Sequence, residues 1–311
     1  MSGVAPLATR LLDRCLGCGA TELRALPLRY EFRGRFPLVE CRRCGLRFLS
    51  AQPRGAALAE LYSSGYFECD FRCGRSAAGY YSEDAFRAEN EGLLDTFDAL
   101  LPAARGAGAA RRRRLLEVGC AGGWLLQRAA GRGWEPQGVE LSADAVAHAR
   151  SLGLAVFEGD LADARFPDGA FDLVYMGDVL EHVPDCRATL DEVARVLAPG
   201  GHLYLRGPIT THSLARRFAL AAYGAAGATI VLREPPYHLW EFRPGPLRDL
   251  CTRAGLEVVR MTQSKIPPGS PHGEKSALQR LALAAIDAVN LPLTRAFNVA
   301  GDRIVLVARR P

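Results

Sequence analysis

The sequence predicts an α/β fold: a doubly wound, mainly parallel seven-stranded sheet with helices on both faces and a small cysteine-rich unit before it. Three observations lead to this prediction. Short β-branched and apolar runs alternate with helical patterns from residue 115 onward. A cluster of small residues directly follows the first of these runs. Four cysteines in two C-x-x-C pairs precede the alternating region.

The alternation continues through the rest of the chain. The apolar runs are five to seven residues long, which suits buried strands, and Gly255 stands where a helix C-terminal glycine belongs. The predicted strands are 115–119, 136–141, 154–159, 171–176, 201–207, 256–261 and 303–309, and the predicted helices are 124–130, 142–151, 186–197, 213–222, 246–254 and 276–297.

Composition divides the chain into three predicted parts. Residues 1–50 form a Cys- and Arg-rich head, and residues 51–110 form a helical lid and linker. Residues 111–311 form the α/β domain, with an insertion near 208–245, between the fifth and sixth predicted strands.

Composition also narrows the class of protein. The 311 residues are 49% hydrophobic and 23% charged, which predicts a large buried core. No apolar run is long enough for a membrane span and the N-terminus lacks a signal-peptide pattern, so we expect a cytoplasmic protein. The net charge is +5, and the arginine run at 111–114 has no interleaved aromatic residues. We therefore expect no nucleic-acid partner.

The turn after the first predicted strand indicates a ligand. Glycines at a strand-to-helix turn let the backbone approach a ligand, and the following helix offers free N–H groups. Here the pattern is Glu117, Gly119, Ala121 and Gly123, in alternate positions. A dinucleotide site would need a third glycine at Trp124, so the indole argues against a bound pyrophosphate.

Five motifs in register extend this observation over residues 114–206. They are "EVGCAGG", "GVELS", "EGDL", "FDLVYMGDVLEHVPD" and "VLAPGGHLYL". With these motifs the sequence resembles the class I S-adenosylmethionine-dependent methyltransferases. The resemblance implies a Rossmann-like methyltransferase fold and S-adenosylmethionine as cofactor, with Ala121 in place of the more usual middle glycine of the loop.

The resemblance also implies the residues that bind the cofactor. Glu140, 23 residues after Glu117, would accept hydrogen bonds from both ribose hydroxyls, and Asp160 would meet the adenine amino group. The alternatives are a surface carboxylate at Glu140 and a turn-former at Asp160. Asp178 would contact the methionine end of the cofactor or the substrate, rather than a metal. The full set is Glu117, Gly119, Cys120, Ala121, Gly123, Glu140, Leu141, Asp160, Leu161 and Asp178.

Methyl transfer to a hydroxyl or a carbon acid requires a base, and histidine suits this role. His182 lies just past the fourth predicted strand, in "DVLEHVPD", and His238 lies in "PPYHLWEF" within the insertion. We predict these two as catalytic residues, with a structural histidine as the alternative for each. Tyr237, Trp240 and Phe242 line a substrate pocket or belong to the core.

The cysteine spacing predicts a metal site in the head. Cys15 and Cys18 are separated from Cys41 and Cys44 by 22 residues, and two such knuckles form a tetrahedral four-thiolate site for structural Zn²⁺. The segment from "CLGCGA" to "YSSGYF" also resembles the zinc-ribbon leader of bacterial methyltransferases, including deoxysugar C-methyltransferases and relatives encoded with polysaccharide genes.

The predicted function is an S-adenosylmethionine-dependent methyltransferase that methylates a hydroxyl or carbon of a small molecule or glycan precursor. The alternatives are a zinc-headed RNA methyltransferase and a non-catalytic zinc-ribbon binding module. No pattern bears on the oligomeric state. The apolar helix at 276–297 packs on the sheet or contacts a membrane surface.

Overall fold

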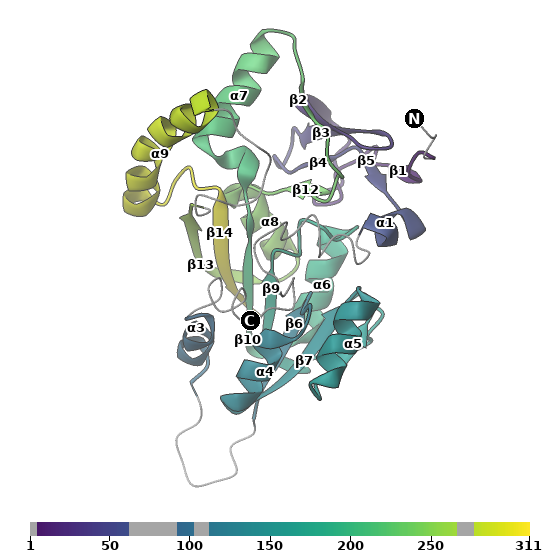
Figure 1. Cartoon of the computed structure of the whole chain (residues 1–311). Coiled ribbons are helices and arrows are strands. Elements are labelled where there is room, and N and C mark those ends of the chain that lie inside the picture. The colour runs from purple at the N-terminus through teal and green to yellow at the C-terminus, as the bar shows by residue number, and fades with distance from the viewer. Residues whose placement is uncertain (1–4, 62–91, 103–111, 266–276) are drawn as a thin grey trace.

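The computed structural model describes residues 5–61, 92–102, 112–265 and 277–311 (Figure 1). Most of the predicted lid and linker, residues 51–110, lies outside these ranges. From that part the structure contains helix α1 (Ala56–Leu61) and helix α3 (Leu93–Leu100).

The central sheet confirms the predicted fold class. Its seven strands have the order β13-β14-β10-β9-β6-β7-β8, and only β14 runs antiparallel to its neighbours β10 and β13. The order of the strands reverses between the parallel neighbours β6 and β9, where a doubly wound sheet binds its ligand. The strands are β6 (Arg113–Val118), β7 (Trp134–Glu140), β8 (Val156–Glu158), β9 (Phe171–Gly177), β10 (Leu197–Pro208), β13 (Glu257–Ser264) and β14 (Arg303–Arg309).

Helices cover both faces because alternate side chains of each strand point to opposite faces. On β9, Leu173 and Tyr175 pack with α3 and α4, whereas Val174 and Met176 join the core beneath α6 and α8. The predicted helices are confirmed as α4 (Trp124–Gly131), α5 (Ala143–Ser151), α6 (Cys186–Val196), α7 (Leu214–Ala225), α8 (Pro244–Arg253) and α9 (Ala277–Phe297).

A second sheet joins the head to the insertion. Its five strands have the order β11-β2-β3-β4-β12, and both edge strands come from the insertion, about 190 to 200 residues away in sequence. The head also contains a two-stranded pair, β1 (Thr9–Leu11) with β5 (Ala51–Pro53). The sheet strands are β2 (Leu23–Glu31), β3 (Arg35–Cys41), β4 (Arg47–Leu49), β11 (Ile230–Leu232) and β12 (Trp240–Glu241).

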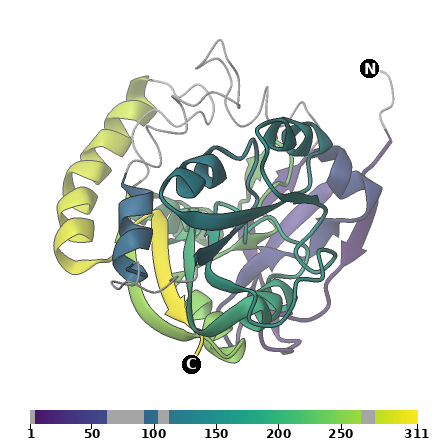
Figure 2. The ribbon, with the colours of Figure 1, turned by 90° about the horizontal axis from the view of Figure 1, so that it is seen from below.

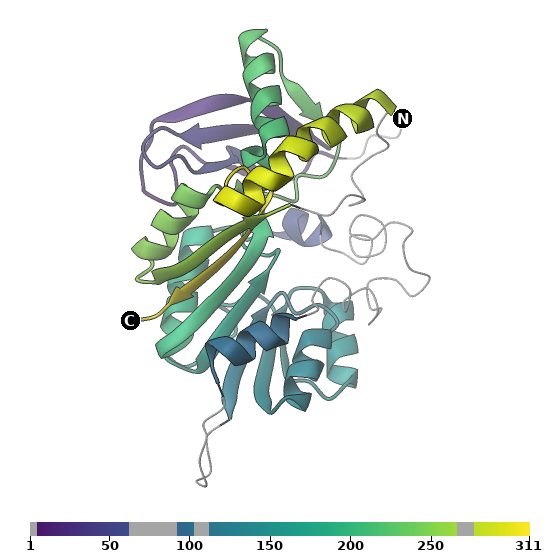
Figure 3. The ribbon, with the colours of Figure 1, turned by 90° about the vertical axis from the view of Figure 1, so that its left-hand side faces the viewer.

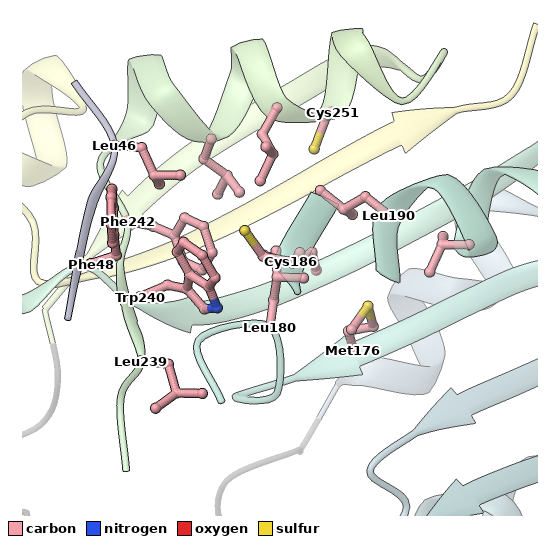
Figure 4. Packing of buried hydrophobic residues seen from close by; sticks show 14 of the residues in the cluster. Leu46, Phe48, Met176, Leu180, Cys186, Leu190, Leu239, Trp240, Phe242 and Cys251 are labelled. Carbon is pink, nitrogen blue, oxygen red and sulfur yellow. The ribbon is translucent and has the colours of Figure 1, made fainter. Parts of the chain in front are cut away.

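One hydrophobic core continues from this second sheet into the α/β domain. Figure 4 shows Phe48 of the head beside Trp240 and Phe242 of the insertion, with Cys186 of α6 and Cys251 of α8 in the same cluster. The Phe48 and Trp240 rings lie 5.5 Å apart between centroids. Trp240 therefore belongs to the core, as does Phe242, and the head is packed into the molecule.

The views place the head at the end of the sheet where the parallel strands finish. Figure 3 shows the head and α7 above the seven-stranded sheet, with α9 packed against α7. Seen from below, the head and α9 lie on opposite sides of the molecule (Figure 2). Among the helices that the structure describes, none is long and apolar enough to cross a bilayer.

Candidate functional site

The turn after β6 adopts the conformation that its small residues allow. Gly119 has a φ of 73°, Ala121 of 48° and Gly123 of 81°, all in the left-handed region that disfavours a side chain. A Cβ on Gly119 would lie 2.5 Å from Val179 Cγ2, and one on Gly123 would lie 2.5 Å from Leu154 Cδ1. Both glycines are therefore required by backbone conformation and by close packing.

Gly119 brings the turn into contact with the loop after β9, residues 178–184. That contact matters because this loop carries His182 and begins directly after the strand next to β6. Cys120 is buried behind the turn, where a Cβ on Gly138 would meet its Sγ at 2.5 Å. Burial raises the pKa of the Cys120 thiol, as expected for a space-filling side chain.

Glu140, the last residue of β7, binds the same turn. Its Oε2 accepts a hydrogen bond from the Ala121 N–H (2.9 Å), and its Oε1 accepts from the N–H groups of Leu141 (2.8 Å) and Ser142 (2.9 Å). A carboxylate has about four lone-pair positions, so these three bonds leave room for a further donor. Burial raises the pKa of Glu140, and the three amide donors oppose that rise.

Glu117 is the carboxyl group that lacks a partner at this edge. It is buried, and its Oε2 accepts no hydrogen bond from the described residues. Burial, reinforced by nearby Glu140, raises the pKa of Glu117 well above its ordinary value of 4.5. A buried acid with an unused oxygen suits a cationic ligand such as the ammonium end of S-adenosylmethionine.

The remaining predicted cofactor residues lie along the same edge. Leu141 is 58% exposed although it is a large apolar residue, so it can cover a flat apolar ligand, whereas Leu161 is buried. Asp160 is exposed and its Oδ1 accepts from the Asp163 N–H at 2.8 Å, which is turn chemistry. No contact within the described residues distinguishes that role from an adenine contact.

Asp178 pairs with two arginine side chains. Its Oδ2 accepts a hydrogen bond from Arg303 of β14 and lies 3.6 Å from Nη2 of Arg206 on β10. Asp178 also has a φ of 56°, so the chain turns sharply where β9 ends. These contacts hold the start of the 178–184 loop against two neighbouring strands.

The structure brings the two predicted catalytic histidines together. His182 and His238 are 56 residues apart in sequence, yet their ring centroids lie 4.9 Å apart in an edge-on arrangement. With Glu181, they offer polar atoms that all lie within 4.8 Å of one another. We call His182 and His238 the histidine pair.

Backbone contacts fix the pair. Nδ1 of His182 lies 3.0 Å from the Tyr237 carbonyl, so this nitrogen carries the hydrogen and donates it. The Glu181 carbonyl accepts from the N–H groups of Leu239 (2.8 Å) and Trp240 (3.2 Å), and Trp240 Nε1 donates to the Val183 carbonyl at 2.7 Å. The insertion is thus anchored along the whole loop after β9.

Burial shifts the pKa values of two members of this group in the direction of their neutral forms. Burial and the neighbouring His238 lower the pKa of His182 to about 3, and the Tyr237 carbonyl only partly opposes this. Burial and the charge of Asp178 raise the pKa of Glu181 well above its ordinary value of 4.5. Oε1 of Glu181 has no hydrogen-bond partner in the described part of the chain and lies 3.8 Å from His182 Nε2.

Sequence reasoning missed Glu241. This residue is buried, and its Oε1 lies 4.0 Å from Nδ1 of His238. The "HLWEF" motif places a carboxylate three residues after the histidine, but in an extended segment that spacing alone does not predict a contact. The turn of the chain between His238 and the two-residue strand β12 brings them together.

The four head cysteines form one cluster. Cys15 Sγ lies 3.6 Å from Cys44 Sγ, and Cys18 Sγ lies 3.6 Å from Cys41 Sγ, with all four sulfurs within 4.8 Å of one another. A tetrahedral Zn²⁺ site with Zn–S bonds of about 2.3 Å would separate its sulfurs by about 3.8 Å. The donor set and its spacing therefore fit zinc.

Comparison with known proteins agrees with the geometry of this edge. A family model described as a methyltransferase domain matches residues 86–261, more than half of the chain. A ubiquinone biosynthesis O-methyltransferase from Ralstonia nicotianae is 33% identical over 158 residues, which cover 48% of this chain and 65% of the relative. One from Aromatoleum aromaticum is 31% identical over 171 residues, covering 50% of this chain and 69% of the relative.

The chain thus spans slightly less than two thirds of the length of the Ralstonia relative. Among solved structures, an S-adenosylmethionine-dependent methyltransferase from Archaeoglobus fulgidus is similar with a TM-score of 0.48 and 16% identity. That similarity covers 73% of this chain and 94% of the Archaeoglobus chain.

Proposed function

The chain belongs to the methyltransferase domain family, and we propose that it transfers a methyl group from S-adenosylmethionine to a hydroxyl group of a small molecule. The observation that carries this proposal is the contact between the glycine turn and the loop that bears His182, made through Gly119 and Val179. A donor held at the turn would lie beside the histidine pair. The two O-methyltransferases reported above support oxygen as the methyl acceptor.

The donor site is proposed to consist of the predicted residues at the carboxyl edge. Glu140 would use its remaining lone pair for the ribose, Leu141 would cover the adenine and Asp160 would approach its amino group. Glu117 and Asp178 would face the cationic end of the donor. The acidic character of this set matches the positive charge of S-adenosylmethionine.

The acceptor side is proposed to use the histidine pair. The bound donor supplies an electrophilic methyl group on a positively charged sulfur. The chain has to orient an acceptor hydroxyl, exclude water and remove the hydroxyl proton. Glycan-precursor hydroxyls and acidic carbon atoms remain within the acceptor class, because both would also need a base at this position.

Zinc in the head is proposed to be structural. Four cysteine thiolates leave no coordination position for water or substrate. Cys15, Cys18, Cys41 and Cys44 would therefore stabilise the head rather than take part in methyl transfer.

The proposal is tested by calorimetric titration with S-adenosylhomocysteine on protein of determined zinc content. We expect binding with a Kd in the micromolar range. Glu140→Ala should weaken binding by roughly 1.5–3 kcal/mol for each charge-assisted hydrogen bond lost. Glu158→Ala, an exposed carboxylate on the neighbouring strand β8, is the matched control and should bind normally.

Acceptors are then screened with labelled donor, using catechol as a simple phenol and UDP-glucose as a sugar nucleotide. Methylated catechol would support the proposed acceptor class. If folded, zinc-loaded protein fails to bind S-adenosylhomocysteine, the proposal is wrong and a non-catalytic binding module is favoured.

A further inference from the structure

We propose that Glu241 is a positioning residue that makes His238, rather than His182, the base for the methyl acceptor. This inference rests on the proposed function, because a base is needed only if an acceptor proton has to be removed. Glu241 was not indicated by any sequence motif. Its position also decides which of the two histidines is proposed as the base.

The Glu241 carboxylate lies between the His238 ring and the Thr210 hydroxyl. Oε1 lies 4.0 Å from Nδ1 of His238, while Oε2 accepts a hydrogen bond from the Thr210 hydroxyl at 3.0 Å. Glu241 is also held in the five-stranded sheet by the pairing of β12 with β4. One oxygen thus fixes the carboxylate and the other faces the imidazole.

His238 is more accessible to solvent than His182. The His238 side chain is 29% exposed, that of His182 is 15% exposed, and that of Glu241 is 6% exposed. An acceptor can therefore reach His238 more easily, whereas its carboxylate partner is shielded from water. A shielded carboxylate interacts with an imidazolium more strongly than an exposed one does.

His182 already makes a structural contact through its ring. Its Nδ1–H donates to the Tyr237 carbonyl, and its Nε2 faces the buried Glu181 at 3.8 Å. Because burial lowers the pKa of His182 to about 3, this ring stays neutral over the range in which a base has to gain a proton. His182 then serves as a neutral neighbour that orients the edge of His238.

The charged and titratable groups around His238 come from three elements. Glu241 lies on β12, and Glu181 and His182 lie on the loop after β9. Tyr30 of β2 approaches Glu241 from the head, and burial together with the Glu241 charge raises the pKa of that phenol. Glu241 is thus the carboxylate that a hydrogen bond from Thr210 holds beside the His238 ring, whereas burial raises the pKa of Glu181.

In the proposed step, a proton moves to His238 while the methyl group moves to the acceptor oxygen. The acceptor hydroxyl gives its proton to Nε2 of His238 while its oxygen forms a bond to the methyl carbon. The electron pair of the breaking carbon–sulfur bond stays on sulfur. The positive charge that leaves the sulfur reappears on the imidazolium, and the Glu241 carboxylate stabilises it there.

The test is an NMR titration of the histidine Cε1–H signals in the full-length, zinc-loaded protein, with His238 assigned by its loss in His238→Gln. We expect Glu241→Gln to lower the His238 pKa by about one unit or more, because a neutral amide no longer stabilises the imidazolium. Gln keeps the size of the side chain and can still accept from Thr210. Glu257→Gln, an exposed carboxylate on β13, is the control and should leave the His238 pKa unchanged.

Thr210→Val provides a second variant if Glu241→Gln does not fold. It frees the carboxylate without removing its charge, so the His238 pKa should move in the same direction by a smaller amount. In a working methyl-transfer assay, Glu241→Gln should lower kcat at least tenfold with little change in the acceptor KM or in S-adenosylhomocysteine affinity.

An unchanged His238 pKa in Glu241→Gln would overturn the inference, whether or not the protein methylates the probes. Displacement of both histidine signals by one further equivalent of Zn²⁺ would also overturn it, because the group would then hold a cation. Since the titration needs no acceptor, failure of this inference is distinguishable from failure of the proposed function.

Discussion

At the scale of single residues, Ala121 occupies a backbone conformation that costs an alanine free energy. Its φ of 48° lies in the left-handed region, where a Cβ approaches the following carbonyl oxygen. The neighbouring glycines, Gly119 and Gly123, meet the same demand without that cost. The Ala121 N–H bond to Glu140 helps to hold the strained residue in place.

Ala121→Gly should therefore raise the free energy of unfolding, by about 0.5–1 kcal/mol, because relief of left-handed strain exceeds the added flexibility of the unfolded chain. Urea denaturation measures the change. Ala188→Gly, in the first turn of α6, is a control of opposite sign and should destabilise by about 0.5–1 kcal/mol. Equal destabilisation in both variants would show that Ala121 is not strained.

At the scale of elements, the two-residue strand β12 is the joint between the head and the insertion. Trp240 pairs with Phe48 of β4 in the sheet and also packs its ring against that residue. The Leu49 N–H donates to the Leu239 carbonyl at 3.0 Å, which continues the joint beyond the paired residues. The joint therefore relies on buried aromatic surface more than on strand length.

Phe48→Ala should lower the free energy of unfolding by about 3–5 kcal/mol, since it leaves a cavity beside Trp240. Phe48→Leu keeps much of the volume and should cost clearly less. The measurement is chemical denaturation followed by tryptophan fluorescence. A loss below about 1 kcal/mol for Phe48→Ala would contradict a shared core.

The strands of the two sheets differ in how well the sequence predicts them. Every strand of the seven-stranded sheet was predicted, because each is a local apolar run between turn residues. Two separate motifs pointed to His182 and His238 as individual candidates, but their contact was not predicted. The edge strands β11 and β12 were not predicted, because each is short and pairs only with residues about 190 to 200 positions away. Glu241 was missed for the same reason, since its neighbours are brought together by tertiary packing.

At the scale of the whole molecule, the head packs against the segment that carries the proposed base. Figure 3 places it above the seven-stranded sheet, and its β4 lies against the segment that carries His238 and Glu241. Arg47 of β4 also donates to the Thr211 carbonyl at 3.1 Å, next to the residue that holds the Glu241 carboxylate. Disturbing the head should therefore disturb the histidine pair.

Cys15→Ser with Cys44→Ser should release the proposed zinc, lower the thermal stability and reduce methyl transfer more than S-adenosylhomocysteine binding. The reason is that Glu117 and Glu140 lie on strands of the seven-stranded sheet, which, among the strands described, pairs with none of the second sheet, whereas the segment after His238 bonds directly to β4. Elemental analysis, calorimetry and the labelled-donor assay provide the three readouts. Cys251→Ser lies outside the four-cysteine cluster and should retain zinc.

Wild-type protein purified without chelator and found to contain no zinc would contradict this prediction. Equal losses of cofactor affinity and methyl transfer would separately contradict the proposed link between the head and the acceptor side.

The joint between the head and the insertion has a consequence for synthesis on the ribosome. At about 5–20 residues per second, some 10–40 seconds pass between the appearance of β4 and that of β12. During that interval the outer edges of β2 and β4 have no partner strand. Such unpaired edges can pair with another chain and lead to aggregation. The yield of soluble protein should therefore depend on how quickly translation proceeds from residue 50 to residue 241.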